Sequence, residues 1–413
     1  MSELAIRGGT PVRSDPYPQW PEIDERDVEA VAAVVRSGQI GGYPEPGPRN
    51  AEFAGRFAAY QGAGHGIVMV NGTVTMEVAL KALGIGWGDE VIVPALTFSA
   101  TAYAAISAGA LPVIVDHEPR RWTIDCDAAE AAITPRTRAI MPVHLGQQMC
   151  DMDRIAEIAQ RHRLAIVEDC AHAHGQQWQG QGAGCIGSFG SFSHQTTKIL
   201  TAGEGGTLLT NDAALARRAH SLIDCGRPKD EAEREYTFGS NYRLGELHCA
   251  LLASQLDRFE AQRAEREQGA RLFEELVAGV PGVSVNAIDP RVTRWSFYRY
   301  LLRIEPEAFA GAGCQTVADA LEAEGVPAEI QYPPMSRNEL FQPSLSRLPV
   351  CVEFADRLDP AKMSFPVAES AAEREAVYFN ENIFRAGRQG VQDAVDAIAK
   401  VQAHASELAA VGV

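Results

Sequence analysis

The sequence predicts an α/β protein: a mostly parallel, seven-stranded sheet followed by a smaller α+β domain. Two observations support this fold class. From residue 66 to about residue 210, short apolar runs alternate with segments whose apolar residues recur at helical spacing. The apolar runs are continuous, which is typical of strands buried on both faces. Repeated strand–helix order indicates a doubly wound sheet, whose ligands bind beyond the carboxyl ends of the strands.

The predicted elements follow one another in a regular order. A Gly/Pro-rich stretch at 41–49 is expected to be a loop ahead of the first full helix. Seven segments have the pattern of buried strands, and helical spacing between them is clearest at 75–83, 99–109 and 153–161. The expected strands are 66–70, 90–94, 111–116, 139–143, 164–168, 188–192 and 206–210.

Beyond the sheet, residues 244–280 have helical periodicity with few breakers, and residues 295–303 have the pattern of a strand. We place a domain boundary inside the long helix, near residue 260. The expected organisation is a large domain at 1–260, which includes an N-terminal arm, and a small C-terminal domain at 261–413.

Composition excludes some classes of function. The 413-residue chain has a formal net charge of -17, and an acidic surface repels phosphate backbones, so nucleic acid is not an expected partner. No apolar run approaches the length of a membrane span, and the residues after Met1 lack the apolar segment of a secretory signal. We therefore expect a cytoplasmic protein without a membrane partner.

Lys198 and Asp169 suggest a cofactor site. Lys198 follows a predicted strand, among small and hydroxylic residues, and its amine can form a Schiff base with an aldehyde cofactor. Asp169 ends another apolar strand, where a carboxylate is costly to bury without a partner. A protonated pyridine nitrogen would be such a partner and would make the ring an electron sink. Taken singly, Lys198 could be a surface lysine and Asp169 a helix cap or ion-pair partner.

A phosphate turn is expected at Gly72 and Thr73, where a strand turns tightly into a helix. Backbone amides at a helix N-terminus carry about half a positive charge and bind phosphate well. Ser193, five residues before Lys198, could add a hydroxyl donor to the same phosphate. Alone, the turn is better explained by simple helix capping, and Ser193 could equally form a bond to its own backbone.

Two aromatic residue types complete the pattern. Phe98 follows the second strand and could stack on a pyridine ring, although a core phenylalanine is the alternative. His172 and His174 lack a third ligand at fitting spacing, so no metal is expected. His172, three residues from Asp169, is better placed to contact a cofactor's phenolic oxygen. Together these residues predict a site for pyridoxal 5'-phosphate.

Five blocks of the sequence resemble the DegT/StrS family of pyridoxal phosphate-dependent sugar and aminocyclitol aminotransferases, over almost the full length of the chain. They are Asn-Gly-Thr at 71–73, Pro-Ala-Leu-Thr-Phe at 94–98, Pro-Val-His-Leu-Gly at 142–146, Val-Glu-Asp-Cys-Ala-His-Ala-His-Gly at 167–175 and Lys-Ile-Leu-Thr-Ala-Gly-Glu-Gly-Gly at 198–206.

The resemblance implies a fold type I aminotransferase that works as a homodimer with shared active sites. It implies that Lys198 forms the Schiff base, that Asp169 binds the pyridine nitrogen and that Phe98 stacks on the ring. It implies that Gly72, Thr73 and Ser193 bind the phosphate. It also brings in Asn241, which would reach the phosphate from the neighbouring subunit.

Within the family, the blocks at 198–206, 225–228 and 239–243 look closest to enzymes that aminate keto-cyclitols and to aminohydroxybenzoate synthases. The resemblance implies transfer from L-glutamine or L-glutamate to a cyclic ketone such as a scyllo-inosose, as in aminoglycoside-type biosynthesis, with pyridoxamine phosphate as the intermediate cofactor form. The chain departs from that branch at Asn380-Glu381, where a pair of histidines is expected, and at Gln331-Tyr332-Pro333-Pro334. The acceptor is therefore left open.

Three alternatives stay open on sequence alone. A nucleotide-linked keto-sugar as acceptor would need a basic pocket for its diphosphate. A pyridoxamine phosphate-dependent dehydratase would lack the lysine that stands at Lys198. A non-catalytic cofactor-binding regulator would need a basic DNA-binding segment, which the sequence does not show.

Overall fold

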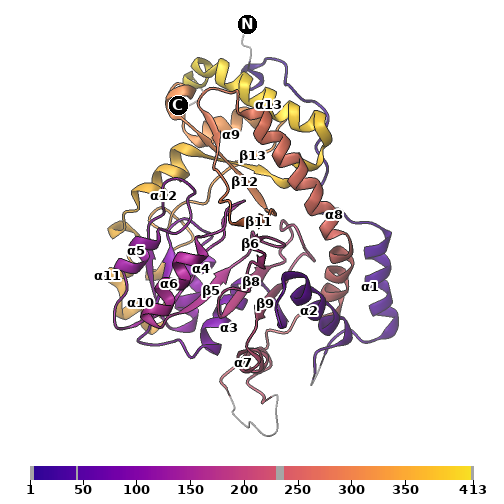
Figure 1. The fold of residues 1–413 in the computed structure, drawn as a ribbon, viewed down its shortest axis with the longest axis vertical. Coiled ribbons are helices and arrows are strands. Elements are labelled where there is room, and N and C mark those ends of the chain that lie inside the picture. The colour runs from indigo at the N-terminus through magenta and orange to yellow at the C-terminus, as the bar shows by residue number, and fades with distance from the viewer. Residues whose placement is uncertain (1–3, 43–44, 229–236, 411–413) are drawn as a thin grey trace.

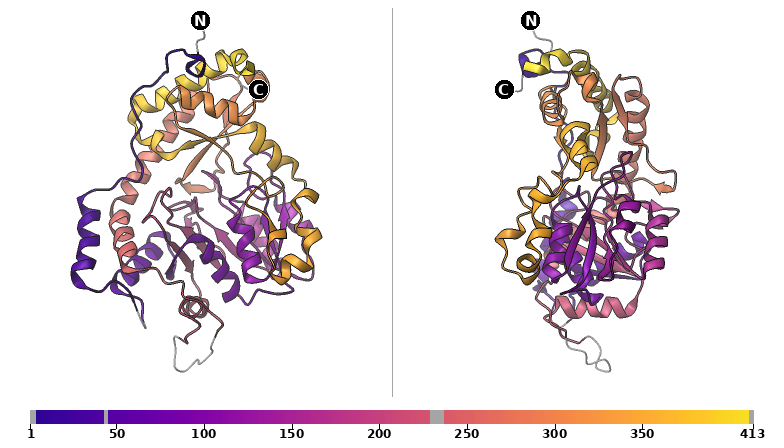
Figure 2. Two further views of the ribbon diagram at one scale, coloured as in Figure 1. Left: turned by 180° about the vertical axis from the view of Figure 1, so that it is seen from behind. Right: turned by 90° about the vertical axis from the view of Figure 1, so that its left-hand side faces the viewer.

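The computed structural model describes residues 4–42, 45–228 and 237–410. A large α/β part carries the main sheet, and a smaller part stands on one end of it, with one long helix running through both (Figure 1). The two further views show the same stacking from behind and from the side (Figure 2). Among the helices of these residues, none combines the length and apolar character needed to cross a bilayer.

All seven expected strands are present in one sheet, which confirms the predicted fold class. The spatial order is β1-β9-β8-β5-β4-β2-β3. Only β9 runs antiparallel to its neighbours, and the other pairings are parallel. The strands are β1 (His65–Met69), β2 (Glu90–Pro94), β3 (Leu111–Val115), β4 (Thr137–Ile140), β5 (Ala165–Asp169), β8 (Phe189–Ser193) and β9 (Gly206–Thr210).

Helices cover both faces of this sheet, as the strand–helix alternation predicts. One expectation is wrong: a full helix precedes the Gly/Pro-rich loop. This helix, α1, begins at a capping box formed by Asp24 and Asp27 and ends at Gly38 in the left-handed region. The helices of this part are α1 (Glu25–Ser37), α2 (Pro48–Gln61), α3 (Gly72–Ala82), α4 (Ala100–Ala108), α5 (Cys126–Ala131), α6 (Met152–His162) and α7 (Ala213–Ile223).

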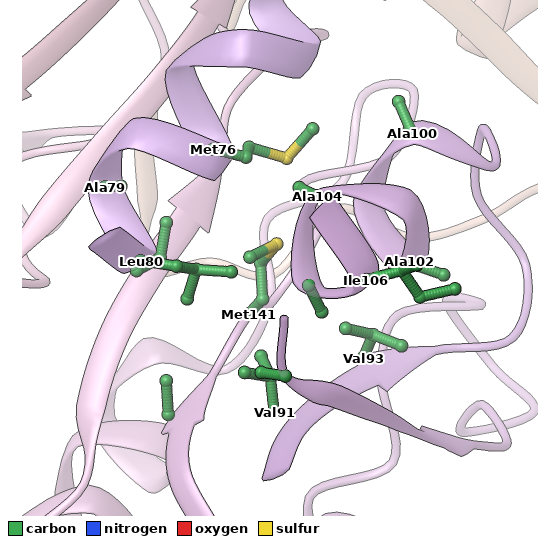
Figure 3. Packing of buried hydrophobic residues seen from close by; sticks show 14 of the residues in the cluster. Met76, Ala79, Leu80, Val91, Val93, Ala100, Ala102, Ala104, Ile106 and Met141 are labelled. Atoms are coloured by element: carbon green, nitrogen blue, oxygen red, sulfur yellow. The ribbon is translucent and has the colours of Figure 1, made fainter. Parts of the chain in front are cut away.

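The core beneath the strand ends is tightly packed. Met76 and Leu80 of α3 and Ile106 of α4 are buried against Val91 of β2 and Met141 (Figure 3). Alanines supply much of the α4 surface, which lets this helix lie close to its neighbours. Fully burying each of the larger side chains contributes about 1.5–3 kcal/mol. The ends of the strands therefore stand on a well-packed base.

The smaller part is built on an antiparallel sheet of order β10-β12-β14-β13. The strand expected at 295–303 is present but begins at Arg299, so its first four residues lie outside it. Two helices pack on this sheet, and the long helix of the sequence pattern connects it to the large part. The elements are α8 (Glu246–Val277), β10 (Val283–Val285), β12 (Arg299–Ile304), α9 (Cys314–Ala323), β13 (Ala328–Ile330), β14 (Ala376–Asn380) and α13 (Gly387–Ala403).

The domain boundary near residue 260 stays a prediction, and some apolar residues pack in the part opposite to the one it assigns them. Phe341, Leu358 and Phe365 follow β13 along the chain but pack in the core of the large sheet. Leu4 and Tyr17 precede the large sheet but pack in the small part. The returning segment holds α10 (Pro349–Glu353), α11 (Ala355–Leu358) and α12 (Pro366–Ser370).

Short elements complete the fold. A small three-stranded sheet of order β11-β6-β7 lies between the two parts. Short 3-10 helices and one short π-helix, η5, link the longer elements of the described residues. These short elements are β6 (Gln177–Trp178), β7 (Gln181–Gly182), β11 (Val292–Arg294), η1 (Ala5–Arg7), η2 (Pro306–Phe309), η3 (Pro343–Leu345), η4 (Pro360–Lys362), η5 (Ala371–Glu375), η6 (Glu381–Arg385) and η7 (Ala405–Ala410).

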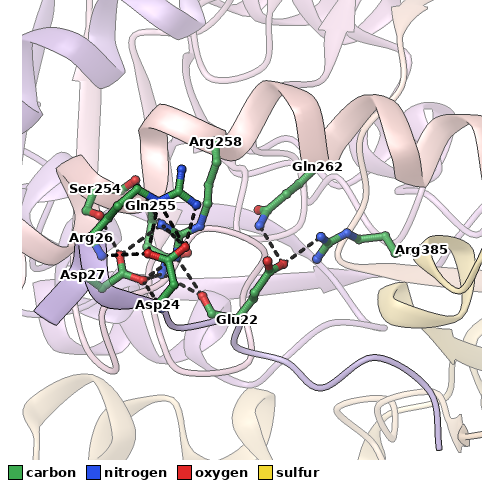
Figure 4. A network of polar contacts seen from close by, with 9 residues as sticks. All are labelled: Glu22, Asp24, Arg26, Asp27, Ser254, Gln255, Arg258, Gln262 and Arg385. Atoms are coloured by element: carbon green, nitrogen blue, oxygen red, sulfur yellow. Dashed lines mark hydrogen bonds and ion pairs between the residues drawn. The ribbon is translucent and has the colours of Figure 1, made fainter.

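A polar network ties the N-terminal arm to α8 (Figure 4). Arg258 of α8 forms a buried ion pair with Asp27, and the Ser254 hydroxyl donates to the same carboxylate at 2.7 Å. Glu22 accepts from Arg385 at 2.8 Å. Removing one partner of a buried ion pair costs about 3–5 kcal/mol, so these contacts hold the arm firmly in place. Trp20, two residues before Glu22, is thereby held near the candidate site.

Candidate active site

A cavity of about 480 Å³ opens beyond the carboxyl ends of the central strands, against the small part. Its volume is within the range of small-molecule sites. Seven of the eight residues expected from the sequence line this cavity; the exception is Asn241. The seven are Gly72, Thr73, Phe98, Asp169, His172, Ser193 and Lys198.

The phosphate turn has the geometry of an anion cradle. The Asn71 side chain caps α3 by accepting from the Val74 amide at 2.9 Å. The amides of Gly72 and Thr73 belong to the first helical turn, where backbone donors have no intrahelical acceptor. A Cβ at Gly72 would lie 2.8 Å from the Cβ of Ser193, so only glycine allows the turn to lie this close to β8. The turn and Ser193 therefore fit a phosphate group.

Asp169 ends β5 and is 5% exposed. Its carboxylate accepts from the Thr101 hydroxyl at 2.9 Å and from the Ala171 amide at 3.1 Å. Burial raises the pKa of this carboxyl group, against these two hydrogen bonds and the charge of Lys198. A cationic group in the cavity would offset that burial cost, and a protonated pyridine nitrogen fits this requirement.

Lys198 is 9% exposed and follows β8. Its Nζ atom lies 4.0 Å from the centroid of the Tyr298 ring, and within the described residues it forms no hydrogen bond or ion pair. Burial lowers the pKa of Lys198 to about 7; Asp169 opposes this shift and Arg299 adds to it. Near neutral pH a large share of this amine is uncharged and nucleophilic.

Phe98 is 49% exposed, although it is a large apolar residue. It lines the cavity, and its ring centroid lies 5.9 Å from that of Tyr332. A core phenylalanine, the alternative left open by the sequence, would be buried. The exposed ring gives the cavity an aromatic face to which a planar ring can pack.

The two histidines differ in their surroundings. His172 lines the cavity, and its Nδ1 accepts from the Gly146 amide at 3.1 Å. Burial lowers the pKa of His172 well below its usual value, so the neutral ring carries its proton on Nε2, 3.3 Å from the Tyr332 hydroxyl. His174 lies behind the cavity wall, with Nε2 2.9 Å from the Ser193 carbonyl oxygen.

The small part supplies two residues that the sequence analysis missed, Tyr298 and Arg299, together with Tyr332, which it named only within the departing segment at 331–334. The Tyr298 hydroxyl lies 2.6 Å from the Thr197 hydroxyl, next to Lys198. From the N-terminal arm, Trp20 Nε1 donates to the Lys198 carbonyl at 3.2 Å. The aromatic and basic residues of 295–303 indicated only a strand, so no local signal marked Tyr298 or Arg299 as site residues.

Comparison with known proteins identifies the family. A family model described as the DegT/DnrJ/EryC1/StrS aminotransferase family matches residues 21–383. The chain belongs to this family. It is an aminotransferase, as the resemblance implied.

Three similar proteins cover almost its whole length. A putative L-glutamine:3-amino-2,3-dideoxy-scyllo-inosose aminotransferase of Streptoalloteichus tenebrarius is 42% identical over 98% of this chain and 99% of its own. The L-glutamine:2-deoxy-scyllo-inosose aminotransferase of the same organism is 38% identical over 98% and 99%. The crystal structure of 3-amino-5-hydroxybenzoic acid synthase is 32% identical, with a TM-score of 0.81 over 95% of this chain and 100% of that one.

A second buried group of the aminotransferase has metal-ligand residue types: His144, Glu168 and Cys170, with ligand atoms within 4.8 Å of one another. Glu168 accepts from the amides of Gly184, Ile186 and Gly187 and lies 3.1 Å from His144 Nε2. These four contacts supply the buried carboxylate with hydrogen-bond partners from the protein itself. Glu168 thus stabilises the loop that precedes β8.

The predicted departures from the keto-cyclitol branch of the family lie around the small sheet of this aminotransferase. Asn380 Nδ2 donates to Glu329 at 3.1 Å. Glu381 forms a buried ion pair with Arg266 of α8 at 2.6 Å. Gln331 accepts from the Tyr378 hydroxyl and from its neighbour's backbone amide at 2.9 Å. None of these three departing side chains lines the cavity; Tyr332 does.

Asn241 is exposed and lies outside the cavity of its own protomer. Its Oδ1 atom accepts from the Arg243 amide at 3.4 Å, and its backbone bridges to Asp224. The expectation that it reaches a phosphate in the neighbouring subunit stays a prediction.

Proposed function

We propose that this aminotransferase uses pyridoxal 5'-phosphate to move an amino group from L-glutamine to a keto-cyclitol of the scyllo-inosose type. The observation that supports this proposal most strongly is the position of Lys198, a buried amine with a lowered pKa that lines the cavity. Asp169, the anion cradle at Gly72 and Thr73, and the exposed ring of Phe98 line the same cavity. Each of these groups fits one part of the cofactor: aldehyde, ring nitrogen, phosphate and ring face.

When bound, pyridoxal phosphate supplies an electron sink for the carbanion that forms at the reacting carbon. Lys198 would hold the aldehyde, and its amine would move a proton to and from that carbon as a general acid–base. Asp169 would keep the ring nitrogen protonated. The amides of Gly72 and Thr73 and the Ser193 hydroxyl would bind the phosphate, and Phe98 would orient the ring. His172 donates through Nε2 toward the cavity, where it can contact the cofactor's phenolic oxygen.

The keto-cyclitol acceptor and the glutamine donor are supported by the relatives of about 40% identity, whose names contain both. A nucleotide-linked keto-sugar is disfavoured, because a diphosphate would need several cations. Among the described residues that line the cavity, only Lys198 and Arg299 carry such a charge. The lysine at position 198 likewise argues against a dehydratase, and the acidic chain argues against a DNA-binding regulator.

The proposal includes a homodimer whose two subunits share their active sites, located in the cytoplasm. Pyridoxamine phosphate would be the intermediate form of the cofactor. Asn241 of the partner subunit would then complete the phosphate site. The exposure of this residue and its position outside the protomer's own cavity support that arrangement.

A product assay tests the function. The protein, loaded with pyridoxal phosphate, is incubated with L-glutamine and one ketone at a time: scyllo-inosose, 2-deoxy-scyllo-inosose or a nucleotide-linked 4-keto-hexose. We expect mass spectrometry to show an aminocyclitol from at least one of the first two ketones. Amination of the nucleotide-linked sugar alone would assign the alternative acceptor class, and no amine from any ketone would count against the proposal.

A further inference from the structure

Arg299 has an unusual place in the cavity. It begins β12, faces Asn380 of β14 in the register of the small sheet, and lines the wall across from the ends of the large sheet. Its guanidinium carbon lies 5.0 Å from the centroid of the Tyr298 ring, and Lys198 Nζ lies 4.0 Å from the same centroid. The two cations are therefore no further apart than the sum of these distances.

The guanidinium is held in place from several sides. Glu329 forms an ion pair with Nη1, and Asn380 Nδ2 donates to the other carboxylate oxygen of Glu329 at 3.1 Å. Nη2 donates to the Tyr298 hydroxyl at 3.3 Å, and the Tyr378 ring centroid is 5.6 Å away. The side chain is 13% exposed. Asn380, one of the predicted departures from the keto-cyclitol branch, thus supports Arg299 through Glu329.

This arginine keeps unused hydrogen-bonding capacity. Within the described residues its Nε donates to no acceptor. A planar guanidinium is the side chain best suited to a carboxylate, because it can form two parallel charge-assisted hydrogen bonds. The other charged groups on the cavity wall are Lys198, which reacts with the cofactor, and the carboxylates Asp169 and Glu204, which repel anions.

A donor amino acid brings a carboxylate bonded to the carbon that reacts beside Lys198. The anion cradle of α3 is used by the cofactor phosphate, so a second anion needs another cation. A keto-cyclitol is uncharged at its ring hydroxyls and gains less from a guanidinium. We propose that Arg299 binds the α-carboxylate of the amino donor. This inference rests on the proposed function and adds a donor subsite to it.

The test separates the two half-reactions. Arg299→Gln and Arg299→Lys are compared with wild type and with Arg303→Gln as matched control. Arg303 lies on the same strand, pairs with Glu375 at 2.6 Å, packs over the Trp122 ring and is not part of the cavity wall. Stopped-flow spectra follow the pyridoxal form with L-glutamine, and the pyridoxamine form with the ketone found in the product assay.

For Arg299→Gln we expect kcat/KM of the glutamine half-reaction to fall about 10- to 100-fold, the effect of losing hydrogen bonds to a charged group. The ketone half-reaction should change little, and Arg299→Lys should lose less than Arg299→Gln because it keeps the charge. The α-amide of L-glutamine, which lacks the carboxylate, should react equally with wild type and Arg299→Gln. Arg303→Gln should behave as wild type, and thermal unfolding should show all variants folded.

Three results would overturn the inference: an unchanged glutamine half-reaction in folded Arg299→Gln, an equal loss in both half-reactions, or a loss confined to the ketone. The last would assign Arg299 to the acceptor. The proposed function fails in a different way, because then wild type itself would react with no amino acid. Calorimetric binding of L-glutamine to the cofactor-free wild type and Arg299→Gln gives a readout of the carboxylate contact without turnover.

Discussion

The two walls of the cavity are built differently. One wall consists of strand ends and a helix N-terminus of the large sheet, where Asp169 pairs with Ser191 in the β5–β8 ladder and the α3 turn lies directly on β8. The other comes from the small part: Tyr298 and Arg299 at the start of β12, and Tyr332 just beyond the three-residue strand β13. The first wall has groups that fit a cofactor; the second has hydroxyls and a cation that fit substrates.

The difference teaches how the two tasks are divided. Cofactor chemistry needs fixed groups, and the packed core beneath the strand ends supplies them. Substrate preference should depend mainly on the second wall, because its residues come from the small part and a change there leaves the strand ends and the helix N-terminus of the first wall in place. Substitutions in the first wall should therefore abolish chemistry, whereas those in the second should shift substrate preference.

The largest effect is expected for Lys198→Ala. On the proposed mechanism, removing the amine would delete both the cofactor attachment and the acid–base group, so turnover should fall by at least about 10³-fold. The visible absorption band of lysine-bound pyridoxal phosphate should disappear, as a spectrum of the purified variant would show. Steady turnover in this variant would remove Lys198 from the mechanism.

The next effect contrasts two adjacent carboxylates. In Asp169→Asn the amide oxygen can still accept from the Ala171 amide, and the amide nitrogen can donate to the Thr101 hydroxyl oxygen, so the free energy of unfolding should change by no more than about 1 kcal/mol, while turnover falls about 10²–10³-fold. Its control, Glu168→Gln, loses acceptors for buried amides and should lower the free energy of unfolding by about 1–3 kcal/mol. Denaturant titration and steady-state kinetics measure both. Equal activity in Asp169→Asn and wild type would contradict the electron-sink role.

A pH effect follows from the lowered pKa of Lys198. Only the neutral amine attacks an aldehyde, so capture of pyridoxal phosphate by the cofactor-free protein should speed up with rising pH and level off above about 7. Well below that pKa the rate should fall about tenfold per pH unit. Stopped-flow absorbance across this range measures it. A rate that still climbs steeply above pH 9 would show that burial does not lower the pKa.

The smallest effect is expected for Tyr332→Phe in the second wall. The hydroxyl shares a hydrogen bond with His172, and a single neutral hydrogen bond contributes about 0.5–1.5 kcal/mol. The KM for the ketone should rise about 2- to 10-fold. Equilibrium titration with pyridoxal phosphate should give an unchanged affinity. A loss of cofactor affinity larger than the change in KM would place Tyr332 with the first wall.

The first wall could be predicted from the sequence because its residues follow continuous apolar runs, and the ends of parallel strands meet at one edge. Gly72, Asp169 and Lys198 are each marked by such a run, and their blocks are specific to the family. The second wall could not, since Tyr298, Arg299 and Tyr332 reach the cavity only through the docking of a second sheet. That docking depends on α8 and on the segment at 335–372 that returns to the large core. The role proposed for Asn241 would depend on a further contact, between subunits.

The most direct measurement of the central claim is an absorption spectrum of the protein with pyridoxal phosphate, before and after L-glutamine, L-glutamate or L-alanine is added. The account predicts a visible band that one donor, L-glutamine, converts to the shorter-wavelength pyridoxamine form, and that a keto-cyclitol then restores. A protein that shows no such band, or a band that no amino acid discharges, would contradict the assignment of Lys198 and Asp169 to a working aminotransferase site.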